Sequence, residues 1–453
     1  MNRETRPKKA RGLLNLQSLS QIRICGYKSI SNPQSIQIRP LTILAGANSS
    51  GKSSIVQPIL LLKQTLEASY DPGTLLLDGP NVRFTSGDQF LSRVGKGKCQ
   101  DIFAIGIDVG SILKLDVSYR WHPDEGLEIQ EMTYKTVRGK NSLRPNMTET
   151  ELESAGPDIR DMKARFGVFP ESEKGKYQLA VTRDRCFLSL EVSLSRGKGK
   201  PITLGGYQPG GIAADPIRQL IHVPGLRGNP IRTYPVTAVG STFPGTFENY
   251  VASVVAQWQA DKDAQKLEGL NQALESLGLT WKVVAHPITH TQAELRVGRL
   301  PHGKRGGAYD LVSIADVGFG VSQTLPVVVA LLVAKRGQIV YLEQPEIHLH
   351  PRAQAQMAGL LAQAGRRGVS VIVETHSSLL LRAIQTLVAK GDLDPKLVKL
   401  HWFARREGDG STVVQSADLD KDGAFGDWPE DFDETSMATE KGYLDAAEAR
   451  TAS

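Results

Sequence analysis

Long apolar runs, paired cysteines and aromatic side chains are all scarce in this sequence of 453 residues. No stretch reaches the roughly eighteen consecutive apolar residues of a membrane-spanning helix, so we expect no membrane span. The three cysteines, Cys25, Cys99 and Cys186, lie far apart, which argues against both a disulfide framework and a clustered zinc site. Aromatic residues make up 6% of the chain, too few for an interleaved stacking platform that binds single-stranded nucleic acid. Because the basic N-terminus also lacks the apolar core of a secretion signal, we expect a cytoplasmic protein with reduced thiols.

Charge is distributed unevenly along the chain, whose formal net charge is +6. Residues 1–20 carry five Lys or Arg against one Glu, and residues 418–450 carry eleven Asp or Glu against three Lys or Arg. The remainder is therefore mildly basic, which is compatible with DNA as a partner. Three basic, glycine-rich stretches at 95–98, 196–200 and 303–307 could meet a nucleic-acid backbone, although such sequences are also ordinary for solvated turns.

The order of the predicted elements indicates an α/β fold. Alternating segments at 20–30 and 35–46 predict strands, and helical spacing follows over 51–69. Strand-rich sequence runs from 101 to 205, and a helix-like stretch covers 247–278. Beyond Asp310 the order helix, strand, helix, strand indicates a parallel sheet.

The segment GANSSGKSS at 46–54 fits the phosphate-loop pattern G-x-x-x-x-G-K-[ST] between an apolar strand and a helix, the context that this motif requires. Its glycines let backbone N–H groups curl around phosphates, and the helix presents its positive end. Lys52 is expected at the β- and γ-phosphates of ATP, and the Ser53 hydroxyl on Mg²⁺. The loop residues predicted to bind the cofactor are Gly46, Asn48, Ser49, Ser50, Gly51, Lys52, Ser53 and Ser54.

Three further segments with polar ends follow in the second half of the chain. The glycine turn DVGFGVSQTLP at 316–326 opens a helix and can present N–H groups to a γ-phosphate held by a second molecule. The apolar strand in IVYLEQPEIHLHP at 339–351 ends in acidic residues suited to holding magnesium and activating water. A last strand, in VIVETHSS at 371–378, ends in His376, which is suited to sensing the γ-phosphate.

This succession of motifs resembles the ABC-type ATPase heads of the SMC/RecF/OLD group, and more closely the stand-alone AAA family ATPases of bacterial anti-phage and DNA-maintenance operons. The resemblance covers about 20–90 and 310–435. It implies an α/β P-loop head, with a mixed or parallel sheet, flanking helices and a strand-rich and helical insertion. It also implies a head-to-tail homodimer, or a larger homo-oligomer. Two ATP molecules would lie between one chain's phosphate loop and Gly318, Gly320 and Ser322 of the other.

The resemblance also implies residue roles, domains and partners. Glu343 would hold the magnesium shell, His376 would be the switch histidine, and Gln89 would act as a Q-loop residue at the metal. The implied domains are a basic tail (1–19), the N-terminal half of the head (20–110), an insertion (111–305), the C-terminal half of the head (306–415) and an acidic tail (416–453). The implied output goes to an effector, a nuclease in prokaryotic anti-phage defence, or directly to DNA. Arg227 and Arg232 flank a turn and could reach either the nucleotide or a carboxylate of the core.

Gln344 occupies the place where the family pattern has its second acid, the residue that polarises the attacking water. A glutamine can orient water through a hydrogen bond, but it cannot accept a proton as a general base. Glu346 could be brought to the water by a bend at Pro345, or it could cap the helix that starts near Pro351. Two alternatives therefore stay open beside an ATPase that controls an effector: a RecF-like ATP-gated DNA-binding repair factor, and a hydrolysis-deficient ATP-sensing scaffold.

Overall fold

A six-stranded sheet forms the centre of the computed structural model, which describes residues 18–93, 99–161, 176–195, 202–300, 302–303, 310–426, 441–442 and 444–445. Its strand order is β11-β16-β17-β3-β18-β19, and only the pairing of β18 with the edge strand β19 is antiparallel. The strands are β3 (Leu41–Gly46), β11 (Ile221–Val223), β16 (Ile339–Glu343), β17 (Ser370–Glu374), β18 (Val398–Arg405) and β19 (Thr412–Ala417). The predicted α/β class with a mixed, mostly parallel sheet is confirmed.

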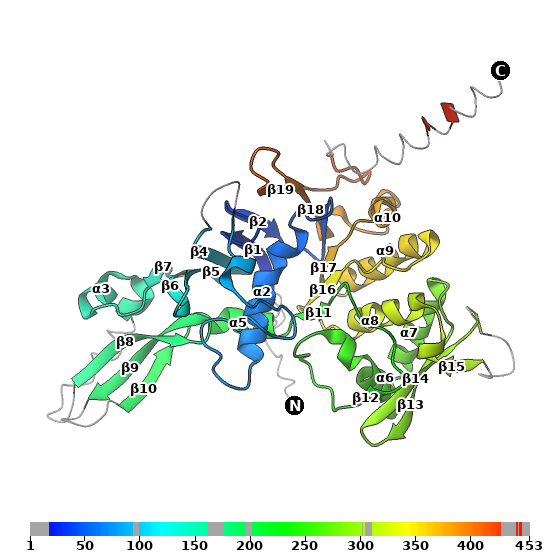
Figure 1. The fold of residues 1–453 in the computed structure, drawn as a ribbon, viewed down its shortest axis with the longest axis horizontal. Coiled ribbons are helices and arrows are strands. Elements are labelled where there is room, and N and C mark those ends of the chain that lie inside the picture. The colour runs from blue at the N-terminus through cyan, green and yellow to red at the C-terminus, as the bar shows by residue number, and fades with distance from the viewer. Residues whose placement is uncertain are drawn as a thin grey trace, which may run out of the picture.

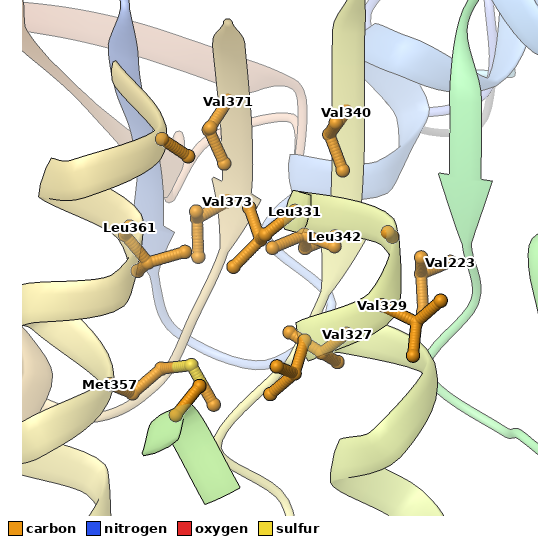
Figure 2. Packing of buried hydrophobic residues seen from close by; sticks show 14 of the residues in the cluster. Val223, Val327, Val329, Leu331, Val340, Leu342, Met357, Leu361, Val371 and Val373 are labelled. Atoms are coloured by element: carbon orange, nitrogen blue, oxygen red, sulfur yellow. The ribbon is translucent and has the colours of Figure 1, made fainter. Parts of the chain in front are cut away.

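Helices cover both faces of this sheet, which explains its nearly continuous apolar strands. Ile339 and Tyr341 belong to the hydrophobic cluster that includes α2 (Lys52–Glu67), which contains Pro58. Val340 and Leu342 belong to the opposite cluster with α8 (Phe319–Val333), α9 (Pro351–Arg366) and α10 (Ser378–Ala389). In Figure 2 the side chains of these two strand residues lie beside those of α8. The period of two along β16 thus separates two cores, one on each side of the sheet.

A second six-stranded sheet is antiparallel throughout, in the order β2-β1-β4-β5-β6-β7. Its strands are β1 (Leu19–Cys25), β2 (Gln34–Gln37), β4 (Ile102–Val109), β5 (Leu113–His122), β6 (Gly126–Thr136) and β7 (Gly139–Leu143). Its buried residues share one hydrophobic cluster with α2, so this helix packs between the two sheets. The domain boundary expected at residue 110 lies in the turn between β4 and β5, which are neighbours in this sheet.

The remaining elements extend on either side of these two sheets (Figure 1). One group holds the sheet β8 (Lys176–Asp184), β9 (Phe187–Ser195) and β10 (Ile202–Tyr207), with α3 (Glu149–Ser154) and α5 (Gly211–Arg218). The other holds β12 (Tyr234–Pro235), β13 (Val283–Thr289), β14 (Gln292–Gly298) and β15 (Leu311–Ser313), with α6 (Val251–Ala260) and α7 (Ala264–Ser276). Short 3₁₀ turns lie at Gly87–Gln89, Phe247–Tyr250, Ile314–Asp316 and Pro395–Leu397.

Two features of the middle of the chain differ from the simplest expectation. The helix-like stretch at 247–278 is divided, because Lys262 adopts a left-handed φ of 52° and Asp263 caps the start of α7. Strand β11, from the predicted insertion, pairs with β16 at the edge of the central sheet.

None of the helices in the described ranges combines the length and the apolar character needed to cross a bilayer. The basic stretches 95–98, 196–200 and 304–307, residues 1–17 and most of the acidic tail lie outside those ranges.

Candidate functional site

The phosphate loop joins β3 to α2 through three left-handed backbone positions. The φ angles are 142° at Gly46, 57° at Ser49 and 100° at Gly51. A Cβ atom on Gly46 would lie 2.2 Å from the carbonyl oxygen of Phe403, so a larger residue cannot occupy this position without moving β18. The loop therefore owes its curled shape to the glycines that the sequence motif specifies.

Side chains from the C-terminal strands hold the loop in place. Arg405 Nε donates to the carbonyl oxygen of Ser49 at 2.8 Å, and Thr412 Oγ1 donates to that of Ser50 at 2.8 Å. The backbone N–H of Thr412 also bonds to the Ser29 carbonyl oxygen at 2.7 Å. No local sequence pattern indicates these supports, because more than 350 positions separate Arg405 and Thr412 from the loop.

Lys52 is buried inside the loop, with only 3% of its surface exposed. Its ammonium group donates to the carbonyl oxygens of Gly46 at 3.1 Å and Ala47 at 2.8 Å. Burial lowers the pKa of Lys52, and the negative charges of Glu374 and Glu346 oppose that shift. The ammonium is thus held at the mouth of the loop, where a phosphate can replace a carbonyl as its partner.

A cavity of about 460 Å³ opens over the loop and brings most of the predicted residues together. It is lined by the predicted loop residues from Asn48 to Ser54 and by the strand-end residues Gln344, Glu374 and His376. Five of the lining residues were not predicted: Lys28, Ser29, Gln57, Glu374 and Arg405. A larger hollow of about 750 Å³ lies among α7, α8 and α9, and its lining contains none of these groups, so we place the candidate site at the smaller cavity.

Two acids lie side by side at the ends of β16 and β17, where Glu343 and Glu374 are register partners. Glu374 Oε1 accepts a hydrogen bond of 2.9 Å from the Ser53 hydroxyl, and its Oε2 accepts one of 3.0 Å from the Tyr341 hydroxyl. Burial raises the pKa of Glu374, while the Ser53 hydrogen bond opposes the shift. The acid in contact with the predicted magnesium ligand Ser53 is therefore Glu374.

Glu343 points instead toward β11 and the turn after it. Asn81 Nδ2 lies 3.0 Å from His222 Nδ1 and also donates to the Gly245 carbonyl oxygen at 3.0 Å. Since an amide nitrogen only donates, His222 Nδ1 accepts, and the Nε2–H group donates to Glu343 Oε1 at 3.1 Å. The Gly225 N–H bonds to Glu343 Oε2 at 3.0 Å. Burial acts to raise the pKa of Glu343, but these hydrogen bonds outweigh it and the pKa is lowered.

Gln344 and Glu346 have distinct settings after β16. Gln344 lines the cavity with a left-handed φ of 44°. Glu346 is buried; its Oε1 accepts hydrogen bonds from the Thr375 hydroxyl at 2.6 Å and from the His376 N–H at 3.1 Å. Its Oε2 has no hydrogen-bond partner among the described residues, and burial raises its pKa. Glu346 does not cap α9, because His350 is the N-cap of that helix.

Arg227 connects the strand end with α8. Its guanidinium donates to the carbonyl oxygens of Gln323 at 2.9 Å, Glu343 at 2.7 Å and Gln344 at 3.2 Å. Burial lowers the pKa of Arg227 to about 10, against the opposing charge of Glu346. It therefore remains charged at neutral pH, and the hydrogen bonds of its guanidinium go to backbone carbonyl oxygens rather than to a carboxylate of the core.

The glycine turn before α8 lies apart from the cavity of its own chain. Gly318 is exposed, and Gly320 and Ser322 are partly exposed at the start of this helix. Of the described residues that line the phosphate-loop cavity, none comes from this turn. On the same surface, Arg232 forms a two-pronged ion pair with Asp316 at 2.7 and 3.0 Å.

Gln89, predicted at the metal, is not brought to the site. It is exposed, and its side-chain amide bonds to the backbone N–H and the hydroxyl of Thr85, both at 2.8 Å. It is absent from the described lining of the cavity, where Gln57 is present instead. The sequence offered no way to decide between these two glutamines.

Comparisons with known proteins match both halves of the chain. Residues 18–176 match a family model described as "AAA ATPase domain", and residues 256–382 match one described as "AAA domain, putative AbiEii toxin, Type IV TA system". No curated protein sequence is significantly similar.

Solved structures of SMC heads align with most of the chain. One is an SMC head bound to the C-winged helix domain of ScpA: 12% identity, TM-score 0.44, 89% of this chain and 98% of that chain covered. Another is the SMC head domain from Thermotoga maritima, with 11% identity, a TM-score of 0.37 and coverage of 88% and 98%. A third, from Pyrococcus furiosus, is an SMC head with an extended coiled coil bound to the C-terminal domain of ScpA. It has 11% identity and a TM-score of 0.45, and the alignment covers 88% of this chain and 96% of that chain. The phosphate loop lies in one matched stretch and the strand-end acids lie in the other, so the chain is similar to AAA-type ATPase domains in both parts that carry the site.

Proposed function

We propose that this chain binds ATP at the phosphate-loop cavity and hydrolyses it within a head-to-tail pair of identical chains. The observation that carries the proposal is the position of the glycine turn at 318–322, which is solvent-accessible and does not line its own chain's cavity. The start of a 15-residue helix offers N–H groups and a positive dipole end to an anion. A second copy can therefore complete the site around the γ-phosphate.

The residues of the cavity divide the chemistry between binding and activation of water. Lys52 and the loop N–H groups would hold the phosphates, and Mg²⁺ bound beside Ser53 would neutralise part of their negative charge. His376 and Gln344 both line the cavity, where His376 would contact the γ-phosphate and Gln344 would orient the water through its amide. Glu346 is buried and is not among the described residues that line the cavity, but of the three strand-end acids it alone has a carboxylate oxygen without a described partner, so we assign it the role of proton acceptor.

The output of the ATP cycle goes to an effector chain. One of the two matched family models is described as a toxin of a type IV toxin–antitoxin system, which fits a role in prokaryotic anti-phage defence. We propose an effector with nuclease activity as the partner, since the sequence resembles the AAA family ATPases of anti-phage operons, for which such an effector is implied.

The experiment measures phosphate release from the purified chain with ATP and Mg²⁺. Lys52→Ala should abolish turnover because the phosphate loop loses its lysine. Ser322→Arg should abolish turnover because its side chain blocks the glycine turn that completes the site of the second chain. Mixing equal amounts of the two variants should restore about a quarter of the wild-type rate, because half of randomly paired dimers contain one intact site. No recovery on mixing, with both variants folded, would contradict a site shared between two chains.

A second candidate is an ATP-sensing scaffold, favoured by the amide of Gln344 at the place of the expected acid. It predicts ATP-dependent dimers in light scattering with no phosphate release. Turnover by the wild-type chain that is lost in Lys52→Ala excludes this candidate, and Glu346→Gln then tests the proton acceptor.

A further inference from the structure

The strand order gives the two neighbouring acids unequal access to the phosphate loop. Strand β17 lies between β16 and β3, and β3 leads directly into the loop. Since adjacent strands are about 4.8 Å apart, Glu374 is one strand from the loop strand and Glu343 is two. A glutamate at position 374 therefore stands between Glu343 and the loop.

The contacts of Glu374 agree with this placement. It is 6% exposed, and one of its oxygens accepts a hydrogen bond from Ser53, the residue whose hydroxyl the phosphate-loop motif assigns to magnesium. The Tyr341 hydroxyl fixes the other oxygen, so the carboxylate has one orientation. Tyr341 comes from β16, the strand that carries Glu343.

The contacts of Glu343 fix it in the opposite direction. Both carboxylate oxygens accept hydrogen bonds from β11 and its following turn, from His222 Nε2 and the Gly225 N–H. Asn81 and the stacked ring of Tyr341, at 5.5 Å between centroids, hold the histidine in turn. Moving Glu343 toward Ser53 would leave the buried His222 N–H without its acceptor.

The donor set at the loop is suited to magnesium. A serine hydroxyl and a carboxylate are hard oxygen donors, and Mg²⁺ in nucleotide sites takes one or two such groups together with phosphate oxygens. Within the described chain, no cluster of three or more His, Cys, Asp or Glu is arranged to hold a metal without further ligands. We propose that Glu374, and not Glu343, is the acid that serves the magnesium shell beside Ser53.

This inference rests on the proposed ATP binding and assigns its metal. The test measures the affinity for a fluorescent, non-hydrolysable ATP analogue by titration, with Mg²⁺ and with EDTA, for wild type, Glu374→Gln and Glu343→Gln. Mg²⁺ should tighten binding by wild type and by Glu343→Gln. Glu374→Gln should show an apparent Mg²⁺ affinity weaker by about 10–100-fold, the usual effect of losing an acid next to a bound metal. Mn²⁺ electron paramagnetic resonance of the ternary complex gives a second readout.

The outcomes separate the two proposals. A Mg²⁺ effect that survives in Glu374→Gln, or is lost equally in Glu343→Gln, would overturn the assignment while leaving ATP binding intact. Failure of the wild type to bind the analogue would overturn the proposed function and the assignment with it. Thermal melting of each variant checks folding, and Glu374→Asp replaces Glu374→Gln if the amide proves unstable; the shorter acid should also weaken the Mg²⁺ effect.

Discussion

Replacing Arg227 by methionine should strongly destabilise the protein, because three backbone carbonyls lose a charged donor at once. The guanidinium is 7% exposed and bonds to carbonyl oxygens of Gln323, Glu343 and Gln344 at 2.7–3.2 Å. Hydrogen bonds to a charged group contribute about 1.5 kcal/mol or more each, which gives about 4–5 kcal/mol for three. The apolar burial of methionine and the removal of a buried charge offset part of this, so the expected loss is about 3 kcal/mol.

Urea unfolding followed by tryptophan fluorescence measures the effect. With an m value of about 3 kcal/mol/M for a chain of this size, the midpoint should fall by about 1 M. Arg232→Met is the matched control, because this arginine lies five positions away in an exposed ion pair with Asp316 and should leave the midpoint unchanged. Equal midpoints for the two variants would refute the view that Arg227 holds the strand end against α8.

Three further predictions concern residues around the site and the core. Burial lowers the pKa of His401 to about 4 from 6.5, so the folded state excludes its proton and stability should fall by up to about 3 kcal/mol as pH drops from 6.5 to 4. His401→Gln should flatten this dependence in urea titrations at each pH. Gly46→Ala should abolish binding of the ATP analogue, because the added Cβ atom clashes with β18. Gly359→Ala is the control, since it lies in open space within α9 and should raise the melting temperature. Normal binding of the analogue by Gly46→Ala would refute the role of this glycine. Lys63 is fully buried and paired with Glu67, so Lys63→Met should lower the free energy of unfolding by about 3 kcal/mol. Adding Glu67→Leu should recover part of this loss, because the unpaired carboxylate is removed, although the backbone groups of Phe243 and Gly245 that bond to the pair lose their partners; additive losses in this cycle, measured by urea unfolding, would contradict the pairing.

The parts of the site that the sequence could predict are those that lie close together along the chain. The loop at 46–54 contains all the glycines, the lysine and the serine of the phosphate-loop motif, so their spacing and the flanking strand and helix were sufficient to predict it. The polar residues after β16 and β17 were predicted because the ends of parallel strands meet at one edge of a sheet. Which acid faces the loop depends instead on which strand lies in the middle, and periodicity carries no information on strand order.

The residues that the sequence could not assign depend on contacts between distant segments. His222 reaches Glu343 only because the three-residue strand β11 joins the edge of the central sheet. Nothing in the local pattern IHV separates such a strand from a turn. Gln89 is the converse case, since the resemblance implied a role at the metal for it, whereas its amide makes its hydrogen bonds locally with Thr85.

The position of β3 in the central sheet has a consequence for the synthesis of the chain. Its two neighbours, β17 and β18, begin at Ser370 and Val398, so both edges of β3 stay unpaired until synthesis reaches the last fifth of the chain. At about 5–20 residues per second, a ribosome needs roughly 20–70 s to cover that distance. During this interval the apolar strand and the first turn of α2 are exposed without their partners, and such an edge can pair with another nascent chain. The cell must therefore keep the N-terminal half of this protein from aggregating before its nucleotide site can exist.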